Sequence, residues 1–251
     1  HPQTHSMVGV GDKVVLPSVT VYLNKKITTS IWEVRIPAGV PENITTPVAV
    51  TSINKTFSSL FAAINGNPPS SGAATLLGTT NLKSIRTSLR LTLYAQNESV
   101  TSTITLTNNW VCDEECNIQI FTPTDISTEC NSRQRHNGVA GSGYKLNVAA
   151  GIIGIYVYDY YVKIEGLHID GGSNTDNALI KYGINLVAKT KILNNILSNA
   201  QYGIFSNLDF ASNQVVAANI IYGMSSSGIE SSTKQFNIYN NTPETLYDIY
   251  F

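Results

Sequence analysis

The segments that decide the fold are YVKIEGLHIDGG (161–172), TKILNNILSNAQYGIFSN (190–207), NQVVAANIIYGMSSSGIES (213–231) and QFNIYNNTPETLYDIYF (235–251). Taken together, they alternate short β-rich runs with Gly, Asn and Ser, a pattern typical of strands separated by turns. Two markers recur along them, spaced 29, 20 and 25 residues for the first and 29, 24 and 22 for the second. They are Gly154-Ile155, Gly183-Ile184, Gly203-Ile204 and Gly228-Ile229, and then Gly166, Asn195, Asn219 and Asn241.

A repeat of 20 to 29 residues is typical of a solenoid, in which each coil packs only on its neighbours. Gly and Asn tolerate the left-handed backbone that a tight corner between strands needs. Earlier segments carry further rung candidates, in which apolar residues alternate with polar ones. These candidates are Leu89, Leu91, Leu93, Ile104, Leu106, Ile118, Ile120, Tyr144, Leu146 and Val148.

From about Thr56 to the C-terminus, this pattern resembles the right-handed parallel β-helix of the pectate-lyase-like superfamily. The resemblance implies an all-β fold, with the β-helix over residues 57–251. It does not imply one activity, because the superfamily contains lyases, hydrolases, tailspikes, adhesins and non-catalytic scaffolds.

Residues 1–56 do not follow the repeat and are predicted to form an N-terminal arm and β extension. Two runs, 19–23 and 32–36, alternate apolar and polar residues as half-buried strands do. A short helix is then predicted, with Thr56 as its N-cap and one apolar face made by Phe57, Leu60, Phe61 and Ile64. Such a helix would cap the open end of the β-helix core.

Composition excludes several classes of function. The chain has 251 residues, only 13% of them charged, and a net charge of −1, which provides no basic field for nucleic acid. No apolar run approaches the ~20 residues that a membrane span needs. The chain begins at His1 and not at Met, which predicts a processed, secreted protein, although an artificial start would look the same.

Sequons and cysteines also favour an extracellular location. Glycosylation candidates are Asn43, Asn54, Asn97 and Asn240, each two residues before Ser or Thr. The three cysteines Cys112, Cys116 and Cys130 are candidates for one disulfide and one remaining thiol. A zinc site is disfavoured, because His136 is the one nearby histidine and no fourth ligand is evident.

A search for catalytic groups finds one partial motif. Asn174-Thr175-Asp176 matches the first motif of polygalacturonases, but the second carboxylate pair, the Gly-His-Gly and the Arg-Ile-Lys of that family have no counterpart here. We therefore assign no catalytic residue and no cofactor. Asp170, Asn174 and Asp176 are weak calcium candidates, with a solvated turn as the alternative. His168 is predicted to point outward from a strand.

The C-terminus suggests self-assembly. Tyr247-Asp-Ile-Tyr250 repeats Tyr202-Gly-Ile-Phe205, so the sequence given stops on a rung strand with no cap after it. The leading hypothesis is a non-enzymatic secreted scaffold that assembles with itself into a filament or surface layer, and truncation is the alternative reading of that end. The assembly candidates are Val19, Val21, Leu23, Tyr247, Ile249 and Phe251.

Two further hypotheses remain open. A carbohydrate-binding or carbohydrate-degrading protein would use a rung face, and the tyrosines at 156, 158, 160 and 161 could stack on sugar rings or form a protein interface. A viral or microbial fibre adhesin would be trimeric. The expected partners are thus the chain itself and polysaccharide, with neither nucleic acid nor a membrane span.

Overall fold

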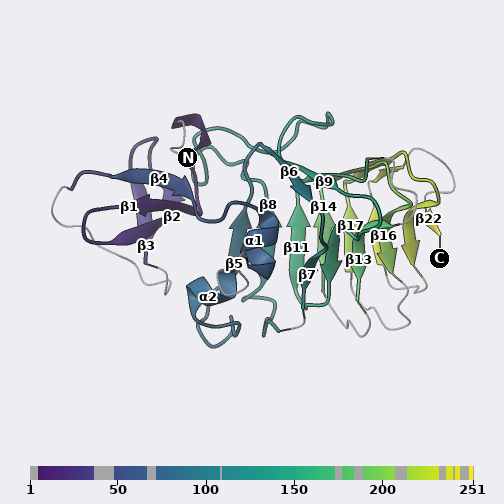
Figure 1. The fold of residues 1–251 in the computed structure, drawn as a ribbon, viewed down its shortest axis with the longest axis horizontal. Helices are drawn as coiled ribbons and strands as arrows, with labels where there is room; N and C mark the ends of the chain where they lie inside the picture. The colour runs from purple at the N-terminus through teal and green to yellow at the C-terminus, as the bar shows by residue number, and fades with distance from the viewer. Residues whose placement is uncertain are drawn as a thin grey trace.

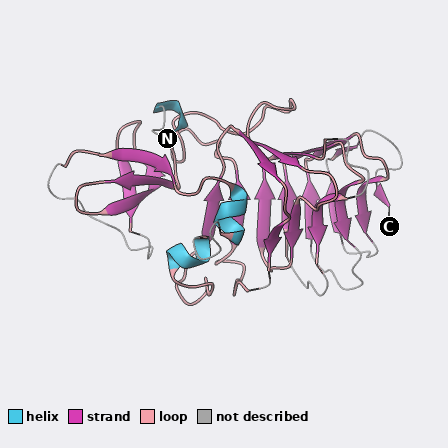
Figure 2. Ribbon diagram, viewed as in Figure 1, coloured by secondary structure: helices cyan, strands magenta, loops and turns pink. Residues whose placement is uncertain are grey.

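The computed structural model describes residues 5–36, 48–66, 72–107, 109–172, 177–183, 189–206, 214–231, 236–239, 241–243 and 249–250. A small antiparallel sheet lies at the N-terminal end, and a stack of parallel strands extends from it to the C-terminal end (Figure 1). Strands dominate the chain, and the helices gather where the two parts meet (Figure 2).

The parallel strands form a β-helix-like solenoid of three six-stranded sheets. Consecutive strands enter the three sheets in turn, so three strands make one coil. Sheet D contains β5 (Leu89–Thr92), β8 (Ile118–Phe121), β11 (Val162–Glu165), β14 (Lys191–Leu193), β17 (Gln214–Ala217) and β20 (Phe236–Tyr239). Sheet E contains β6 (Asn97–Val100), β9 (Lys145–Val148), β12 (His168–Asp170), β15 (Ile196–Ser198), β18 (Ile220–Tyr222) and β21 (Thr242–Pro243). Sheet F contains β7 (Ile104–Leu106), β10 (Ile155–Val157), β13 (Ala178–Tyr182), β16 (Tyr202–Ser206), β19 (Ser227–Ser231) and β22 (Ile249–Tyr250).

Aliphatic side chains stack in the interior of the solenoid. In sheet F the register places Ile104, Ile155, Ile180, Ile204 and Ile229 in one column, and each is at most 1% exposed. The predicted rung residues from Leu89 to Val148 are buried, as expected. The register corrects the second Gly-Ile marker: Ile180, and not Ile184, pairs with Ile155, because Gly183 and Ile184 come after β13.

The second marker is a ladder of buried asparagines at the corner between sheets D and E. The Oδ1 of Asn219 accepts bonds from the backbone N (2.9 Å) and the Nδ2 (3.0 Å) of Asn195. Asn241 accepts the same two bonds from Asn219, each at 2.9 Å. The ladder also bonds to strand-end carbonyls, since Asn219 Nδ2 donates to Ile192 O at 3.0 Å. The asparagine side chains thus form hydrogen bonds with backbone groups at the corner that cannot pair within the sheets.

The corner residue itself lies one position before the ladder. Gly166, Asn194 and Ala218 occupy equivalent positions and have φ of 80°, 54° and 56°. The sequence marker had aligned Gly166 with Asn195, which is wrong by one residue. A Cβ on Gly166 would also lie 2.3 Å from Thr122 Oγ1, so this position needs glycine for space as well as for its backbone angle.

The cap of the solenoid consists of α1 (Leu60–Asn65) and α2 (Ala73–Leu77). Ser59, and not Thr56, is the N-cap of α1, because its Oγ accepts the backbone N–H of Ala62 at 2.9 Å. The Thr56 hydroxyl instead donates to Gly11 O. Glu98 holds α1 in place, since its carboxylate accepts the backbone N–H groups of Leu60 and Phe61.

The N-terminal sheet has the order β3-β2-β1-β4 and is antiparallel, after a short 3-10 helix at His5–Met7. Its strands are β1 (Asp12–Val15), β2 (Thr20–Lys26), β3 (Trp32–Arg35) and β4 (Ser52–Lys55). It has its own small core, made by Val8, Val14, Leu16, Val21 and Leu23.

The N-terminal sheet joins the solenoid through the loop after β8. Val10 N donates to Glu129 O and Lys26 N donates to Thr128 O, each at 2.8 Å. Gly9 bridges to Cys130, where a Cβ on the glycine would lie 2.5 Å from Tyr94 Oη. The sheet is therefore docked on the solenoid by backbone hydrogen bonds.

Candidate functional site

A row of partly exposed side chains follows the outer face of sheet F. The register places Tyr156, Lys181, Phe205 and Glu230 side by side on consecutive strands. Lys181 Nζ lies 5.7 Å from the ring centroid of Tyr156 and 5.1 Å from that of Phe205, so one ammonium lies between two rings. We call these four residues the aromatic row.

Two more rings widen the aromatic row. Tyr158 lies 4.3 Å from Tyr156 between ring centroids, and Tyr202 lies 4.8 Å from Phe205. Tyr158 packs over Gly183, where an added Cβ would come within 2.1 Å of the ring. Burial and the hydroxyl of Tyr158 raise the pKa of Tyr156 to about 12, so the Tyr156 phenol is protonated at neutral pH and can donate a hydrogen bond.

A second polar cluster lies on the outer face of sheet E and contains a serine beside a histidine. His168 Nε2 lies 3.0 Å from Ser198 Oγ, and Ser198 Oγ donates to Asp170 Oδ1 at 3.1 Å. His168 Nδ1 accepts the backbone N–H of Gly141 at 3.1 Å. Because Nδ1 is an acceptor, the proton of the neutral ring lies on Nε2, and His168 donates to Ser198.

This orientation does not prepare Ser198 as a nucleophile, since a general base must accept the serine proton. Burial, reinforced by Lys145, lowers the pKa of His168 to about 4, which keeps the ring neutral. His168 is 3% exposed because the loop of residues 133–143 covers it. His168 was predicted to point away from the core, and its hydrogen bonds to Gly141 and Ser198 are compatible with that direction. The side chain is nevertheless buried.

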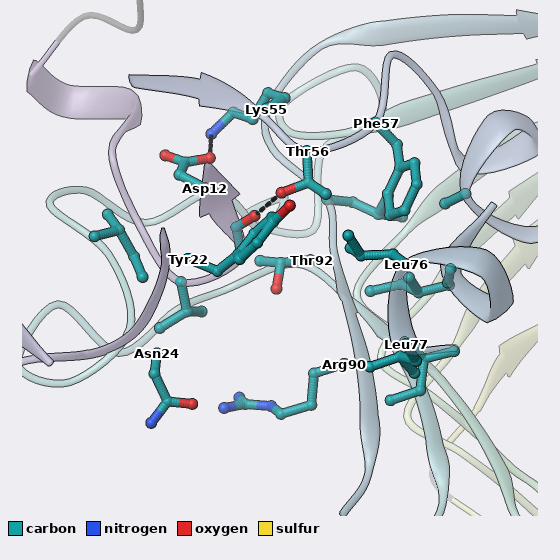
Figure 3. A pocket seen from close by; sticks show the side chains of 18 of the residues that line it. Asp12, Tyr22, Asn24, Lys55, Thr56, Phe57, Leu76, Leu77, Arg90 and Thr92 are labelled. Atoms are coloured by element: carbon teal, nitrogen blue, oxygen red, sulfur yellow. Dashed lines mark hydrogen bonds and ion pairs between the residues drawn. The ribbon is translucent and has the colours of Figure 1, made fainter. Parts of the chain in front are cut away.

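A cavity of about 390 Å³ lies where the N-terminal sheet meets the cap of the solenoid (Figure 3). Phe57, Leu76 and Leu77 form an apolar wall, and Asn24 and Arg90 lie at the opposite side. Its charged groups already have protein partners: Asp12 pairs with Lys55 at 2.8 Å, and Arg90 pairs with Glu129 at 2.8 Å. Each pair lies within one part of the molecule, since Asp12 and Lys55 belong to the N-terminal sheet and Arg90 and Glu129 to the solenoid. We therefore assign these charges to the stability of each part and not to a ligand.

The calcium candidates do not form a free ligand set among the described residues. Asn174 and Asp176 lie outside them. Asp170 is engaged by Lys145 Nζ at 2.6 Å, Asn199 Nδ2 at 2.9 Å and Ser198. In the part of the chain that the structure describes, no group of three or more His, Cys, Asp or Glu side chains is placed to hold a metal ion.

The cysteines correct the disulfide prediction, because Cys112, Cys116 and Cys130 are all free thiols. Cys130 is fully buried at the junction and its Sγ lies 3.6 Å from Asp125 O, whereas Cys112 and Cys116 pack on the solenoid core. Burial raises the pKa of Cys130 to about 11 and that of Cys112 to about 12, which suppresses the reactive thiolate.

The sequons occupy different environments. Asn97 is exposed at the start of β6, whereas Asn54 is half-buried in β4 and donates to Ser52 Oγ. Asn43 and Asn240 lie outside the described residues. Among the ranges that the structure describes, no helix has the length and apolar character required to span a membrane.

The assembly candidates divide in a similar way. Val21 and Leu23 are 1% and 5% exposed in the core of the N-terminal sheet, and Val19 is partly buried against that core. Their strand, β2, is paired on both sides, so it has no free edge for a neighbouring chain. Ile249 continues the sheet F register opposite Ile229, as the repeat predicted, while Tyr247 and Phe251 lie outside the described residues.

Tyr156 and Tyr158 were predicted from the sequence as a possible sugar-binding or interface cluster, whereas Lys181 and Phe205 were not. A signal was available, because the residue after each isoleucine of the sheet F column points outward.

No family model matches the chain, and neither the curated proteins nor the solved structures contain a match to it. The fold itself thus defines the class: an all-β, β-helix-like solenoid with an N-terminal antiparallel sheet.

Proposed function

We propose that this chain is an extracellular polysaccharide-binding protein that holds its ligand along sheet F. The observation that carries the proposal is the aromatic row, with rings of Tyr156 and Phe205 on either side of Lys181. Aromatic faces stack on the C–H faces of sugar rings, and the neighbouring ammonium and phenol groups can bond to hydroxyl and carboxylate oxygens. The strands repeat every ~4.8 Å along the axis, which suits an extended chain better than a single sugar.

The resemblance in sequence adds a finer proposal, that the solenoid is a right-handed β-helix of the pectate-lyase-like type. The asparagine ladder and the three-strand coil support it. A role in binding does not require the catalytic groups of that superfamily.

Secretion is also part of the proposal, and the exposed Asn97 sequon supports it. A mobility shift on deglycosylation, absent from Asn97→Gln, would test that part.

Binding is best tested by affinity electrophoresis and calorimetry with soluble neutral and uronate-containing polysaccharides. We expect Tyr156→Ala and Phe205→Ala each to weaken binding about tenfold, as expected for one lost stacking contact. Tyr222→Ala, on the outer side of sheet E, is the matched control and should bind normally. Lys181→Gln should weaken binding to the uronate polymers more than to neutral ones. Equal binding by wild type and both ring variants would refute the proposal.

A second candidate is the end-to-end assembly suggested by the sequence. The observation that favours it is the register of the last coil, in which Ile249 pairs with Ile229 of the preceding strand in sheet F. β20, β21 and β22 are the outermost strands of their sheets among the described residues, and a second copy stacked there would continue all three ladders. Negative-stain microscopy should show filaments at high concentration, and uniform short particles at every concentration would exclude it.

A further inference from the structure

β3 is an edge strand of the N-terminal sheet among the described residues. This strand pairs with β2 on one side, and no described strand lies on its other side. An edge of this kind presents backbone groups that can pair with another strand. All four residues of β3, Trp32 to Arg35, are only partly buried. Among the described residues, β3 is therefore paired on one side only, and its side chains are only partly buried.

The side chains of β3 alternate in character. Trp32, Val34 and Ile36 face the small core of the sheet and are only partly covered by it. Glu33 and Arg35 share the other face, with side chains 41% and 39% exposed. Within one chain they lie 3.5 Å apart, a weak and solvated pair. Glu33 is also held by Asn24 Nδ2 at 2.7 Å, which fixes the direction of its carboxylate.

We propose that two copies of this chain pair through β3 in antiparallel fashion, with the two-fold axis at Val34. In this register Glu33 of each copy lies opposite Arg35 of the other, so two opposite-charge pairs form. On the other face Trp32 lies opposite Ile36, and Val34 lies opposite its own equivalent. A shift by one residue would place charged side chains opposite apolar ones, so the pattern selects this register. The result is a continuous eight-stranded antiparallel sheet.

The hairpin tip beside this edge adds apolar surface. Ile27 and Ile31 are 56% and 58% exposed, and Ile27 N donates to Ile31 O at 2.9 Å, which places them on one tip. A second copy on β3 would approach Ile31, the residue directly before the strand. This interface does not involve sheet F, so it does not depend on the glycan-binding proposal.

The test is sedimentation equilibrium of the full 251-residue chain at concentrations from about 1 to about 100 µM. Two chains that pair through one strand each should associate in this range. The wild type is expected to form a dimer. Glu33→Arg places arginine opposite arginine, and Arg35→Glu places glutamate opposite glutamate, so each variant should dimerise at least about tenfold more weakly. A wild type that stays monomeric throughout would overturn the proposal.

The two single variants also control for misfolding. When they are mixed, each arginine of one chain meets a glutamate of the other, so a heterodimer should form with about the wild-type affinity. The double variant Glu33→Arg/Arg35→Glu should recover self-association for the same reason. A dimer that is insensitive to all of these changes, or single variants that fail to associate on mixing, would place the interface elsewhere and overturn the assignment of β3.

Discussion

The N-terminal sheet and the solenoid bury their apolar side chains in different ways. The solenoid repeats one coil, so its core is continuous and its corners are tied by asparagines that bond from coil to coil. The N-terminal sheet has a separate core of five buried residues and depends on the loop of residues 123–134 for support. The solenoid is therefore stabilised by packing between its own coils, whereas the N-terminal sheet has a small core and also bonds to a loop of the solenoid.

The asparagine ladder offers the largest expected difference between the two regions. Asn219→Ala removes the acceptor of Asn195 and leaves buried donors without partners. We expect it to lower the free energy of unfolding by about 4 kcal/mol. Asn54→Ala, in the N-terminal sheet, removes one half-buried bond to Ser52 and should cost only about 0.5 kcal/mol. Urea denaturation of both variants measures the difference, and similar losses would contradict it.

Acid should weaken the solenoid around His168. Burial holds the pKa of His168 at about 4, below its usual 6.5, so the neutral ring is favoured in the folded state. The contribution of the neutral His168 ring to the free energy of unfolding is present above pH 6.5 and is lost as the pH falls through 4. The loss is up to about 3 kcal/mol. Amide exchange of Gly141, corrected for intrinsic rates, should therefore accelerate over this range. In His168→Asn, whose Oδ1 can still accept that N–H, exchange should not follow pH.

The N-terminal sheet should respond to acid in the opposite direction. Burial raises the pKa of Asp12 to about 6, from 3.8, despite the nearby Lys55 ammonium. The contribution of protonated Asp12 to the free energy of unfolding is therefore present below pH 3.8 and is lost as the pH rises through 6. The loss is at most about 3 kcal/mol. Amide exchange of Val21 should be slower at pH 4 than at pH 7 after the same correction. Loss of that trend in Asp12→Asn would confirm the cause.

The cap helix gives a smaller effect at the boundary between the regions. Glu98→Ala removes the acceptor for Leu60 N, Phe61 N and the Tyr144 hydroxyl, which donates at 2.6 Å. We expect a loss of about 2 kcal/mol, with faster amide exchange in α1 than in β14. Tyr144→Phe removes only one of these bonds and should cost about 1 kcal/mol. Equal effects on α1 and β14 would show that Glu98 acts on the whole solenoid.

Much of the fold followed from local pattern, but the alignment of coils did not. Alternation predicted the buried rung residues from Leu89 to Val148, and spacing predicted a solenoid. The same spacing misplaced Gly183 and Gly166, because the loops between strands vary in length and a marker in a loop drifts out of register. The apolar run predicts Thr56 as the N-cap of the helix, but Ser59 is the N-cap and the Thr56 hydroxyl donates to Gly11 O.

The candidate site shows the same division. Tyr156 and Tyr158 were visible as a cluster in the chain, but their association with Lys181 and Phe205 depends on strands 24 or 25 residues apart. His168 and Ser198 are 30 residues apart and meet because β12 lies beside β15. The sequence makes Val21 and Leu23 candidates for assembly, but a local pattern cannot tell whether its apolar face has a partner within the same chain.

By itself the sequence determined that the chain is rich in strands, repeats in coils and turns its corners at Gly and Asn, because these properties depend on residues close together. Only the tertiary structure decided which residues share a row, which hydroxyl caps α1 and in which order the strands of the N-terminal sheet pair. Those outcomes depend on contacts between distant segments, whose register is set by packing and hydrogen bonding across the whole stack.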